Sequence, residues 1–345
     1  MKVNVLSDKI GWFGKYSGYE CLPNYYPKCI DATVNTATYN LYNKVLGKFF
    51  KVQSKINSRS EDIFNEIKFS RKLSSNDASH ILYLESHLHL LKSVAPRNRI
   101  FGTIHLPVSR WSKNRLMMLE HIENVILLYD EEVEIFKQYV PSQKVHVIKH
   151  GVDTDFFKPG LPENIIKNKL LFVGHFLRNF EMTLKVFTTI RKEISNNFEF
   201  HFIIPSAFRN TPVIQKIQQL DKVYFHEKLS DKELLQQYQT SNLLVMPMED
   251  SGANTAIIQA LSVGLPVITT DVGGIRSYGG GTVFPIVQNN DTLGMCELIF
   301  KFFDNQNFRN DVSADQQEFS KRFLDWHLVA KQHIELYKQK TLQYS

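Results

Sequence analysis

Residues 242–278 constrain the fold more than any other part of the chain. Residues 243–248 form an apolar run that suits a strand buried in a parallel sheet, and apolar residues recur at helical spacing from Asn254 onward. Gly264 ends that helix, and residues 266–270 form a second apolar strand. Strand, helix and strand in this order predict a parallel βαβ unit, the building block of α/β sheets.

The two loops that follow these strands consist of polar and small residues. The first loop leads into the helix N-terminus at Asn254, and the second is Asp271-Val272-Gly273-Gly274. Ligands of open α/β sheets bind beyond the carboxyl ends of the strands, and the free N–H groups of a helix N-terminus favour a phosphate. Every βαβ unit has such loops, so a plain pair of connections remains the alternative here.

Two short motifs give this stretch a resemblance to a known family. Gly264-Leu265-Pro266-Val267 and Thr270-Asp271-Val272-Gly273-Gly274 resemble the donor-binding segment of the retaining glycosyltransferases of family 4. The resemblance implies the α/β GT-B fold, with two Rossmann-like domains around a donor cleft. It also implies a nucleotide-sugar donor, retention of configuration and no metal. The Glu-x7-Glu motif of that family is absent, because Ser251 and Gln259 occupy its two positions.

Composition fits a globular protein of two domains, since the 345 residues are 43% hydrophobic and 22% charged. No apolar run is long enough to span a membrane, and residues 1–8 are typical of a first strand rather than a signal peptide. Cys21, Cys29 and Cys296 have no metal-site spacing, and their odd number favours a reducing compartment. We therefore expect a cytoplasmic protein without a metal site. The net charge of +6 favours anionic partners, but no nucleic-acid-binding motif accompanies it, so nucleic acid is not expected.

A glycine-rich turn follows the first strand, with Gly11, Gly14 and Gly18 among aromatic residues. Glycine lets a ligand approach the backbone closely, although this spacing does not fit the dinucleotide fingerprint. The resemblance implies that Ser17-Gly18-Tyr19 faces the active cleft, with Gly18 towards the donor and Tyr19 on the acceptor side. A plain glycine turn remains the alternative.

Residues 41–72 are basic and contain aromatic residues at helical intervals. The basic side chains include Lys44, Lys48, Lys51, Lys55 and Arg59. Such a segment either lies on an anionic lipid surface with its aromatic residues buried, or packs its apolar side on the core as an ordinary surface helix. The pattern alone favours the ordinary helix, because any core helix shows this periodicity.

His105 ends the apolar strand at residues 100–105. The resemblance places an active-site histidine at such a Thr-Xaa-His, so we predict His105 as the catalytic residue. Arg110 and Trp111 follow closely and are candidates for the acceptor side, with a surface arginine and a packed indole as the equal alternative. His87 and His89 are two residues apart, which does not make a helical metal pair.

The domain boundary is expected at His150-Gly151-Val152-Asp153, which resembles the interdomain Asn-Gly-Val-Asp segment of family 4. Its content of glycine, aspartate and a following proline predicts an exposed connection with few packing demands. The chain then divides into an acceptor-side domain (1–150), a nucleotide-sugar-binding domain (151–325) and a terminal helix (326–345). The Trp-Xaa-Xaa-Val-Ala run that opens this helix resembles the one that returns to the first domain in the GT-B fold.

A cation for the diphosphate is expected after the strand at residues 170–174. The family carries an arginine and a lysine in this loop; His175 and Phe180 hold those places here, and Arg178 lies between them. Arg178 is three residues beyond His175, so the two could share one face of a helical turn. A guanidinium binds phosphate oxygens through two N–H groups and is always charged. We therefore predict Arg178, with His175 beside it, as donor-binding.

The N-terminus of the helix after residue 254 completes the expected donor site. The remaining donor-binding candidates are Ser251, Gly252, Ala253, Asn254, Thr255 and Gln259. Backbone N–H groups of residues 252–255 are expected to bind the diphosphate, and Gln259 keeps an acceptor oxygen for the ribose. Ser251 cannot replace a carboxylate, although Glu249 or Asp250 could reach inward.

The sequence thus predicts a glycosyltransferase that moves a sugar from a UDP- or GDP-linked donor to a glycan or lipid-linked acceptor, with no further cofactor. The missing glutamates support a second hypothesis, a non-catalytic glycosyltransferase-like subunit that acts with a partner. A nucleotide-sugar epimerase of the same architecture is the third and requires acid and base carboxylates, which the sequence does not assign. Peripheral contact with the anionic inner face of the membrane is compatible with residues 41–72.

Overall fold

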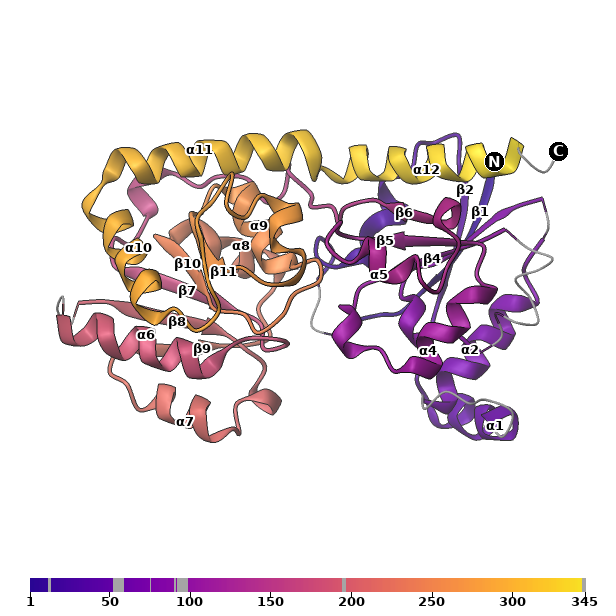
Figure 1. Cartoon of the computed structure of the whole chain (residues 1–345), viewed down its shortest axis with the longest axis horizontal. Coiled ribbons are helices and arrows are strands. Elements are labelled where there is room, and N and C mark those ends of the chain that lie inside the picture. Colours follow the sequence, from indigo (N-terminus) through magenta and orange to yellow (C-terminus); the bar gives the residue numbers. More distant parts are fainter. Residues whose placement is uncertain are drawn as a thin grey trace. The chain divides into compact units, whose positions relative to one another are not determined.

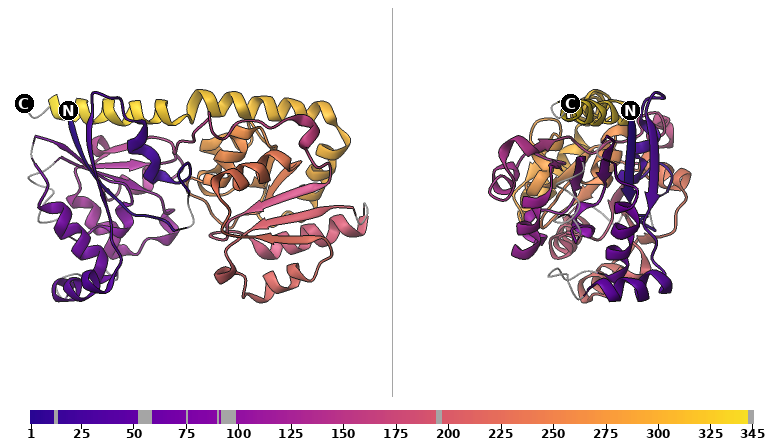
Figure 2. Two further views of the ribbon diagram at one scale, coloured as in Figure 1. Left: turned by 180° about the vertical axis from the view of Figure 1, so that it is seen from behind. Right: turned by 90° about the vertical axis from the view of Figure 1, so that its right-hand side faces the viewer.

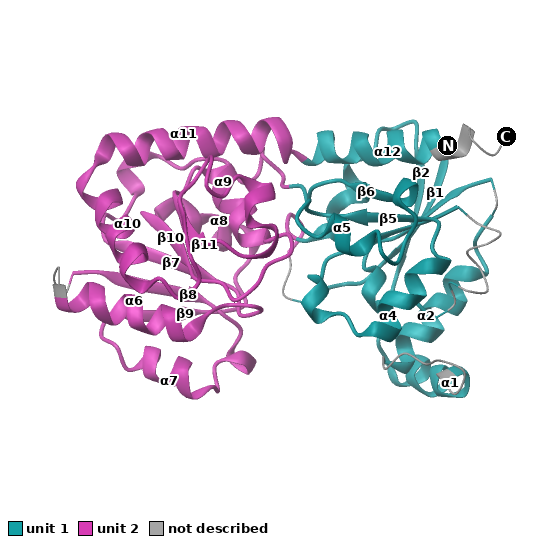
Figure 3. Cartoon of the chain, in the orientation of Figure 1, with its two compact units in different colours: residues 1–13, 18–151, 326–345 teal, residues 14–17, 152–325 magenta. Residues whose placement is uncertain are grey.

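The computed structural model of the protein describes residues 1–11, 14–51, 59–74, 76–89, 91, 99–193 and 197–342. The chain forms two compact units, which Figure 3 shows in different colours. Unit 1 comprises residues 1–13, 18–151 and 326–345, and unit 2 comprises residues 14–17 and 152–325. The segment 14–17 differs from the sequence-based division, because it packs with unit 2.

Unit 1 is built on a six-stranded parallel sheet of order β2-β1-β3-β4-β5-β6 (Figure 1). Its strands are β1 (Lys2–Ser7), β2 (Asp31–Thr36), β3 (Ala78–Ile81), β4 (Arg99–Ile104), β5 (Asn124–Leu127) and β6 (Val145–Val147). Its helices include α1 (Leu41–Lys51), α2 (Ser60–Ser70), α4 (Lys113–Met118), α5 (Val133–Phe136) and α12 (Trp326–Leu342). All four residues of β3 and of β5 are buried, as a parallel sheet covered on both faces requires.

Unit 2 repeats the plan with a second six-stranded parallel sheet of order β12-β11-β10-β7-β8-β9. Its strands are β7 (Lys169–Val173), β8 (Glu199–Ile203), β9 (Val223–His226), β10 (Leu243–Met246), β11 (Val267–Thr270) and β12 (Ile286–Val287). Its helices are α6 (Phe180–Glu193), α7 (Pro212–Gln218), α8 (Asp231–Thr240), α9 (Thr255–Val263), α10 (Thr292–Asp304) and α11 (Gln306–Phe323). The two sheets confirm the expected α/β architecture.

The βαβ unit predicted from residues 242–278 is present as β10, α9 and β11. Gly264 ends α9 with φ of 76°, a conformation that residues with a side chain rarely adopt. The next strand, β12, begins at Ile286. Before it, residues 279–284 form a tight turn, in which the Val283 N–H donates to the Gly279 carbonyl at 2.7 Å.

The last helix, α12, belongs to unit 1 and packs along the short helix η1 (Tyr19–Tyr25; Figure 2). A chain of buried hydrogen bonds joins the two. His333 Nδ1 lies 2.8 Å from the Val329 carbonyl, so it carries the proton, and Nε2 accepts from the Tyr19 hydroxyl at 2.8 Å. Tyr19 in turn accepts from Thr103 of β4 at 3.4 Å.

The chain of hydrogen bonds continues to the far end of α12. His80 of β3 lies with Nε2 2.8 Å from the Thr103 hydroxyl and with Nδ1 2.6 Å from the Tyr337 hydroxyl. The Tyr26 hydroxyl lies 3.2 Å from that of Tyr337. Each buried polar atom in this series has a partner, so α12 is held in one register on unit 1.

The connection at residues 150–153 is buried, which corrects the expectation of an exposed segment. His150 and Val152 are only 3% and 2% exposed. Gly151 lies directly against the indole of Trp326, and any side chain at this position would collide with the ring. Close packing on α12 therefore requires glycine at this position, whereas the composition of the segment suggested a loose linker.

We expect the buried histidines of unit 1 to make the protein acid-sensitive. Burial lowers the pKa of His105 to about 3 and those of His150 and His333 to about 4, and burial also lowers the pKa of His80. Because the unfolded chain binds these protons at higher pH, stability is complete above the unfolded pKa and is lost as pH falls towards the folded values. Each such histidine should lower the free energy of unfolding by about 1.4 kcal/mol per pH unit below about pH 6.

Urea unfolding at neutral and mildly acidic pH measures this dependence. In His333→Gln, the amide can still accept from Tyr19 but no longer titrates. The slope of the unfolding free energy against pH should therefore fall by the contribution of one proton, about 1.4 kcal/mol per pH unit. A slope equal to that of the native chain would contradict the assignment of His333 as a neutral buried group.

Candidate functional site

The loop after β7 lies at the carboxyl edge of the unit 2 sheet and carries His175 and Arg178. It is not a helical turn, because Gly174 and Leu177 have φ of 87° and 59° and α6 begins only at Phe180. The expectation that His175 and Arg178 share a helical face is therefore wrong. His175 instead stacks on Phe208, with ring centroids 3.5 Å apart.

Arg178 is held in place by backbone carbonyl groups. Its Nε and Nη2 donate to the Val173 carbonyl at 3.0 and 2.9 Å, and Nη1 donates to the Phe176 carbonyl at 2.8 Å. Among the described residues, no carboxylate forms an ion pair with this guanidinium. Burial lowers its pKa to about 10, so it stays charged at neutral pH. Within the described part of the chain, the site thus contains a cation that backbone carbonyl groups hold and that has no carboxylate counterion.

Arg209, in the loop after the neighbouring strand β8, offers a close comparison. Its Nε and Nη2 donate to the carbonyl of Ile204 at 2.8 and 2.5 Å, much as Arg178 holds the carbonyl that ends β7. Arg209, however, lies 3.8 Å from a carboxylate oxygen of Glu227. The two arginines therefore share a structural role, but only Arg209 has its charge compensated.

Arg178 reaches the N-terminus of α9, where an anion would be favoured. Its Nη2 lies 3.5 Å from Oδ1 of Asn254, which caps α9 by accepting from the N–H of Ile257 at 3.3 Å. Ala253 and Thr255 on either side are partly exposed, whereas Gly252 is buried. The structure therefore places Arg178 beside residues 252–255, so that a cation and a helix N-terminus meet at one point.

Ser251 and its acidic neighbours stabilise the loop before α9. Ser251 is buried; its hydroxyl donates to the Gly252 carbonyl at 2.8 Å, and its N–H donates to Asp250 Oδ1 at 2.7 Å. Glu249 is exposed. Asp250 therefore orders the loop backbone, and the expectation that Glu249 reaches inward is not met.

Gln259 is buried with both ends of its amide occupied. Tyr238 donates to Oε1 at 3.0 Å, and Nε2 donates to the Ser17 hydroxyl at 2.9 Å. The expected acceptor oxygen for a ribose is thus already used within unit 2. No sequence signal pointed to Ser17 as the partner, because the two residues are 242 positions apart.

The segment 14–17 is held on unit 2 at further points. Lys15 N–H donates to Asp231 Oδ2 at 2.8 Å, and Tyr16 stacks on Phe156 at 3.9 Å with ring planes 6° apart. Gly14 lies so close to the Asp231 carboxylate that a side chain would collide with it. We call residues 14–17 the strap. Through Ser17, the strap is hydrogen-bonded to the buried Gln259.

The carboxyl edge of the unit 1 sheet carries His105 and Glu85. His105 Nε2 lies 2.8 Å from the Leu82 carbonyl and the ring stacks on Tyr83 at 4.4 Å. Burial and the neighbouring His150 keep this imidazole neutral, with a pKa of about 3. Glu85 accepts a hydrogen bond from the backbone N–H of His105 at 3.4 Å, and burial raises the pKa of Glu85 to about 7. Glu85 is thus a carboxyl that exchanges its proton near neutral pH, which the sequence did not reveal.

Of the other predicted site residues of unit 1, Gly18 forms a turn, Tyr19 and Trp111 are buried, and Arg110 is exposed. Gly18 has φ of 89°, so this turn requires glycine. Tyr19 and Trp111 are buried, and the indole of Trp111 donates to the Leu106 carbonyl at 3.2 Å and packs in the hydrophobic core. Arg110 is exposed. The acceptor-side role of Tyr19 and Trp111 is corrected to packing, since neither side chain is accessible.

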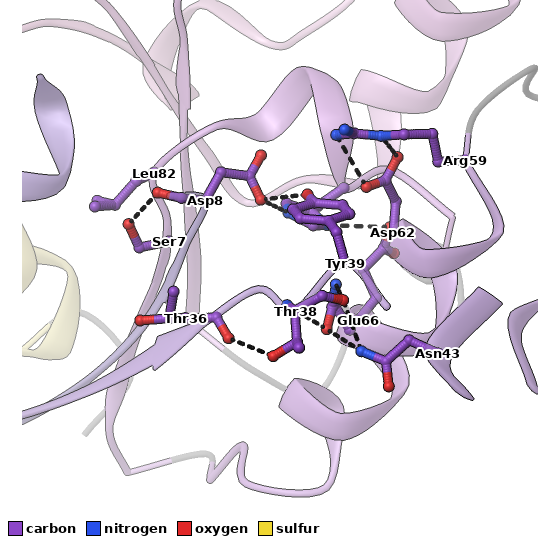
Figure 4. Close-up of polar contacts among 12 residues, drawn as sticks. Ser7, Asp8, Thr36, Thr38, Tyr39, Asn43, Arg59, Asp62, Glu66 and Leu82 are labelled. Carbon is purple, nitrogen blue, oxygen red and sulfur yellow. Dashed lines mark hydrogen bonds and ion pairs between the residues drawn. The ribbon is translucent and has the colours of Figure 1, made fainter. Parts of the chain in front are cut away.

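A second polar cluster lies beyond the ends of β1 and β3 (Figure 4). Asp8 Oδ1 accepts from the Tyr39 hydroxyl at 2.7 Å and lies 3.0 Å from His87 Nε2. Burial alone would raise the pKa of Asp8, but the hydrogen bond and charge of His87 outweigh it and lower the pKa. The pKa of His87 is raised in turn, against burial, by Asp8 and then by Glu66 and Asp62. The cluster is therefore a buried ion pair, and the described residues contain no group of three metal-ligating side chains.

Comparison with known proteins bears on the fold of the chain. Residues 167–305, which contain most of the unit 2 site, match the family model described as Glycosyl transferases group 1. The crystal structure of a glycosyltransferase from Rickettsia africae is 14% identical, covers 100% of this chain and 99% of its own, and has a TM-score of 0.70. Anabaena Alr3699/HepE in complex with UDP-glucose is 13% identical, with 98% and 100% covered and a TM-score of 0.74. The chain has the GT-B fold.

A curated relative of this GT-B chain is D-inositol 3-phosphate glycosyltransferase of Xylanimonas cellulosilytica. It is 20% identical over 246 residues, which are 64% of this chain and 55% of the relative. The chain spans about half the length of the curated relatives with the longest matches. In the described part of the GT-B chain, no helix is both long and apolar enough to cross a membrane.

We expect the bond between the strap and Gln259 to be measurable as an energetic coupling. Ser17→Ala leaves the buried Gln259 Nε2 without this hydroxyl, which should cost about 1–3 kcal/mol of unfolding free energy. In a double-mutant cycle with Gln259→Ala, the coupling should be about 1 kcal/mol. The measurement is urea unfolding of the four proteins, and strictly additive effects would show that the contact does not form in solution.

Proposed function

We propose that the protein is a glycosyltransferase that transfers a sugar from a nucleotide-sugar donor to a glycan or lipid-linked acceptor, with retention of configuration. The observation that carries the proposal is Arg178, a rigid cation without a carboxylate partner beside the N-terminus of α9. The match to glycosyl transferases group 1 over residues 167–305 and the GT-B fold support it.

The geometry suits the charge that develops in such a reaction. When the glycosidic bond to the diphosphate breaks, negative charge builds on the leaving phosphate oxygens and needs fixed positive groups. Arg178 and the backbone N–H groups of residues 252–255 would supply them without reorganisation, because backbone carbonyl groups already fix the guanidinium. On unit 1, the neutral His105 would accept a hydrogen bond from a hydroxyl of the sugar or the acceptor through Nδ1, since Nε2 faces the Leu82 carbonyl.

The donor is expected to be a UDP- or GDP-linked sugar, and no metal or further cofactor is invoked. A related GT-B structure contains UDP-glucose, which supports a nucleotide diphosphate sugar as the class. Its ribose would meet Gln259 only if the Ser17 hydrogen bond opens, so donor binding and movement of the strap would be coupled. We propose a cytoplasmic location, since Cys21, Cys29 and Cys296 form no disulfide with one another.

A non-catalytic subunit that acts with a partner is the second candidate. It is favoured by Ser251 and Gln259, which replace two glutamates, and by the bonds that already occupy Gln259. An epimerase would need an acid and a base, and Glu85 is a single carboxyl with a pKa near neutrality. The transferase therefore ranks first.

We expect one nucleotide sugar from a panel of UDP-, GDP- and ADP-sugars to raise the melting temperature. A ligand at a hundred times its dissociation constant stabilises by about 2.7 kcal/mol, which corresponds to roughly 5 °C for a unit of this size. Arg178→Ala should abolish the shift, because the diphosphate loses its cation. Arg209→Ala is the matched control: it removes the same kind of carbonyl-bound guanidinium and should keep the shift.

Differential scanning fluorimetry of the three proteins provides the measurement. Equal loss of the shift in both variants would assign it to general loosening of unit 2. If no nucleotide sugar shifts the native chain, the transferase proposal fails and the partner-dependent subunit takes its place.

A further inference from the structure

Helix α1 exposes apolar side chains that a helix in a globular unit normally buries. Leu41 and Phe49 are each 76% exposed, and Tyr42, Val45 and Phe50 are also exposed. Every other described helix carries at most one large exposed apolar side chain. The sequence pattern of residues 41–72 favoured helices with their apolar side on the core; this is wrong for α1, whereas α2 does bury Ile63 and Phe69. Lys55 of that segment lies outside the described residues.

The reason is that α1 packs on α2 through its small, polar face. Asn43 is fully buried and donates to the Thr38 carbonyl at 2.6 Å, and its Oδ1 accepts from Lys68 at 3.0 Å. One turn later, Gly47 lies against the Ser60 backbone, where any side chain would collide. Because Asn43 and Gly47 fix this face, the apolar row must point away from α2.

Exposed lysines run beside the apolar row. Leu41, Val45 and Phe49 are spaced four residues apart and form one row along the helix. Lys44 and Lys48, both exposed, form the adjacent row, and α1 contains no acidic residue. Figure 1 shows α1 at the margin of unit 1, beyond α2. The helix thus presents an apolar stripe and a cationic stripe together at the edge of its unit.

We propose that α1 binds an anionic membrane surface, with its apolar row in the headgroup region and its lysines on acidic lipids. This is the arrangement of helices that lie in a membrane interface. The charge favours acidic lipid over a second copy of the chain, because the same helix of a second copy contains no acidic residue to pair with these lysines. The proposal goes beyond the transferase function and does not depend on the nucleotide site.

The test is flotation of the full chain with vesicles of phosphatidylcholine alone and with one third phosphatidylglycerol. We expect binding only to the anionic vesicles, and binding that weakens as salt screens the lysines. Leu41→Ser/Phe49→Ser should weaken binding at least about tenfold, and Lys44→Gln/Lys48→Gln about twentyfold, with roughly fivefold for each lysine.

Two controls separate this effect from misfolding. Leu161→Ser/Leu293→Ser removes two apolar side chains that are 60% and 70% exposed on unit 2 and should leave vesicle binding unchanged. The α1 variants should keep the nucleotide-induced shift in melting temperature, so failure of this proposal is distinguishable from failure of the transferase proposal.

Three outcomes would overturn the proposal. They are no binding of the native chain to anionic vesicles, equal binding to neutral vesicles, and binding that the α1 variants leave intact. Concentration-dependent self-association that Leu41→Ser/Phe49→Ser abolishes, without vesicle binding, would instead assign the row to a second copy of the chain.

Discussion

The hydrogen bond between Tyr337 and His80 joins the last helix of the chain to a central strand of unit 1. It is one link in a buried series in which each ring nitrogen of His80 and His333 has a partner and the hydroxyl groups of Tyr19, Thr103 and Tyr337 have two each. Burial keeps both imidazoles neutral. Apolar packing alone would tolerate a sliding helix, whereas a completed buried hydrogen-bond series tolerates one register. The helix that completes unit 1 thus begins more than 170 positions after the preceding segment of that unit ends.

Parallel strands bring all carboxyl ends to one edge of each sheet, and this constraint assembles the candidate sites. In unit 2 it brings the loop after β7 against the N-terminus of α9, so Arg178 meets Asn254 although 76 positions separate them. Arg178 and Arg209 both hold carbonyl groups at or just after strand ends, and among the described residues a carboxylate lies within ion-pair distance of Arg209 but not of Arg178. A charged arginine without a nearby carboxylate is costly for the fold and would favour an anion.

The structure shows which hydrogen bonds Gln259 forms at the second position of the absent Glu-x7-Glu motif. Gln259 replaces a carboxylate by a neutral amide, and an amide can both donate and accept. Its N–H donates to Ser17 while its oxygen accepts from Tyr238. An ionised glutamate could accept from both hydroxyl groups, so the amide at this position changes the charge of the buried group and the direction of the bond to Ser17.

The sequence by itself determined the parallel α/β elements and the βαβ unit around α9, because hydrophobic periodicity, helix-ending glycine and helix-cap residues are local signals. Arg178 as the cation came from the resemblance and stays a prediction. The sequence also determined the composition of α1 but not which side faces the core. That depended on Gly47 and Asn43 packing against α2, a contact between helices. Likewise, the turn at Leu177, the burial of Gly151 under Trp326, the pairing of Ser17 with Gln259 and the raised pKa of Glu85 were decided only by the tertiary structure. Each depends on close approach of residues distant in sequence, or on burial, which no local pattern encodes.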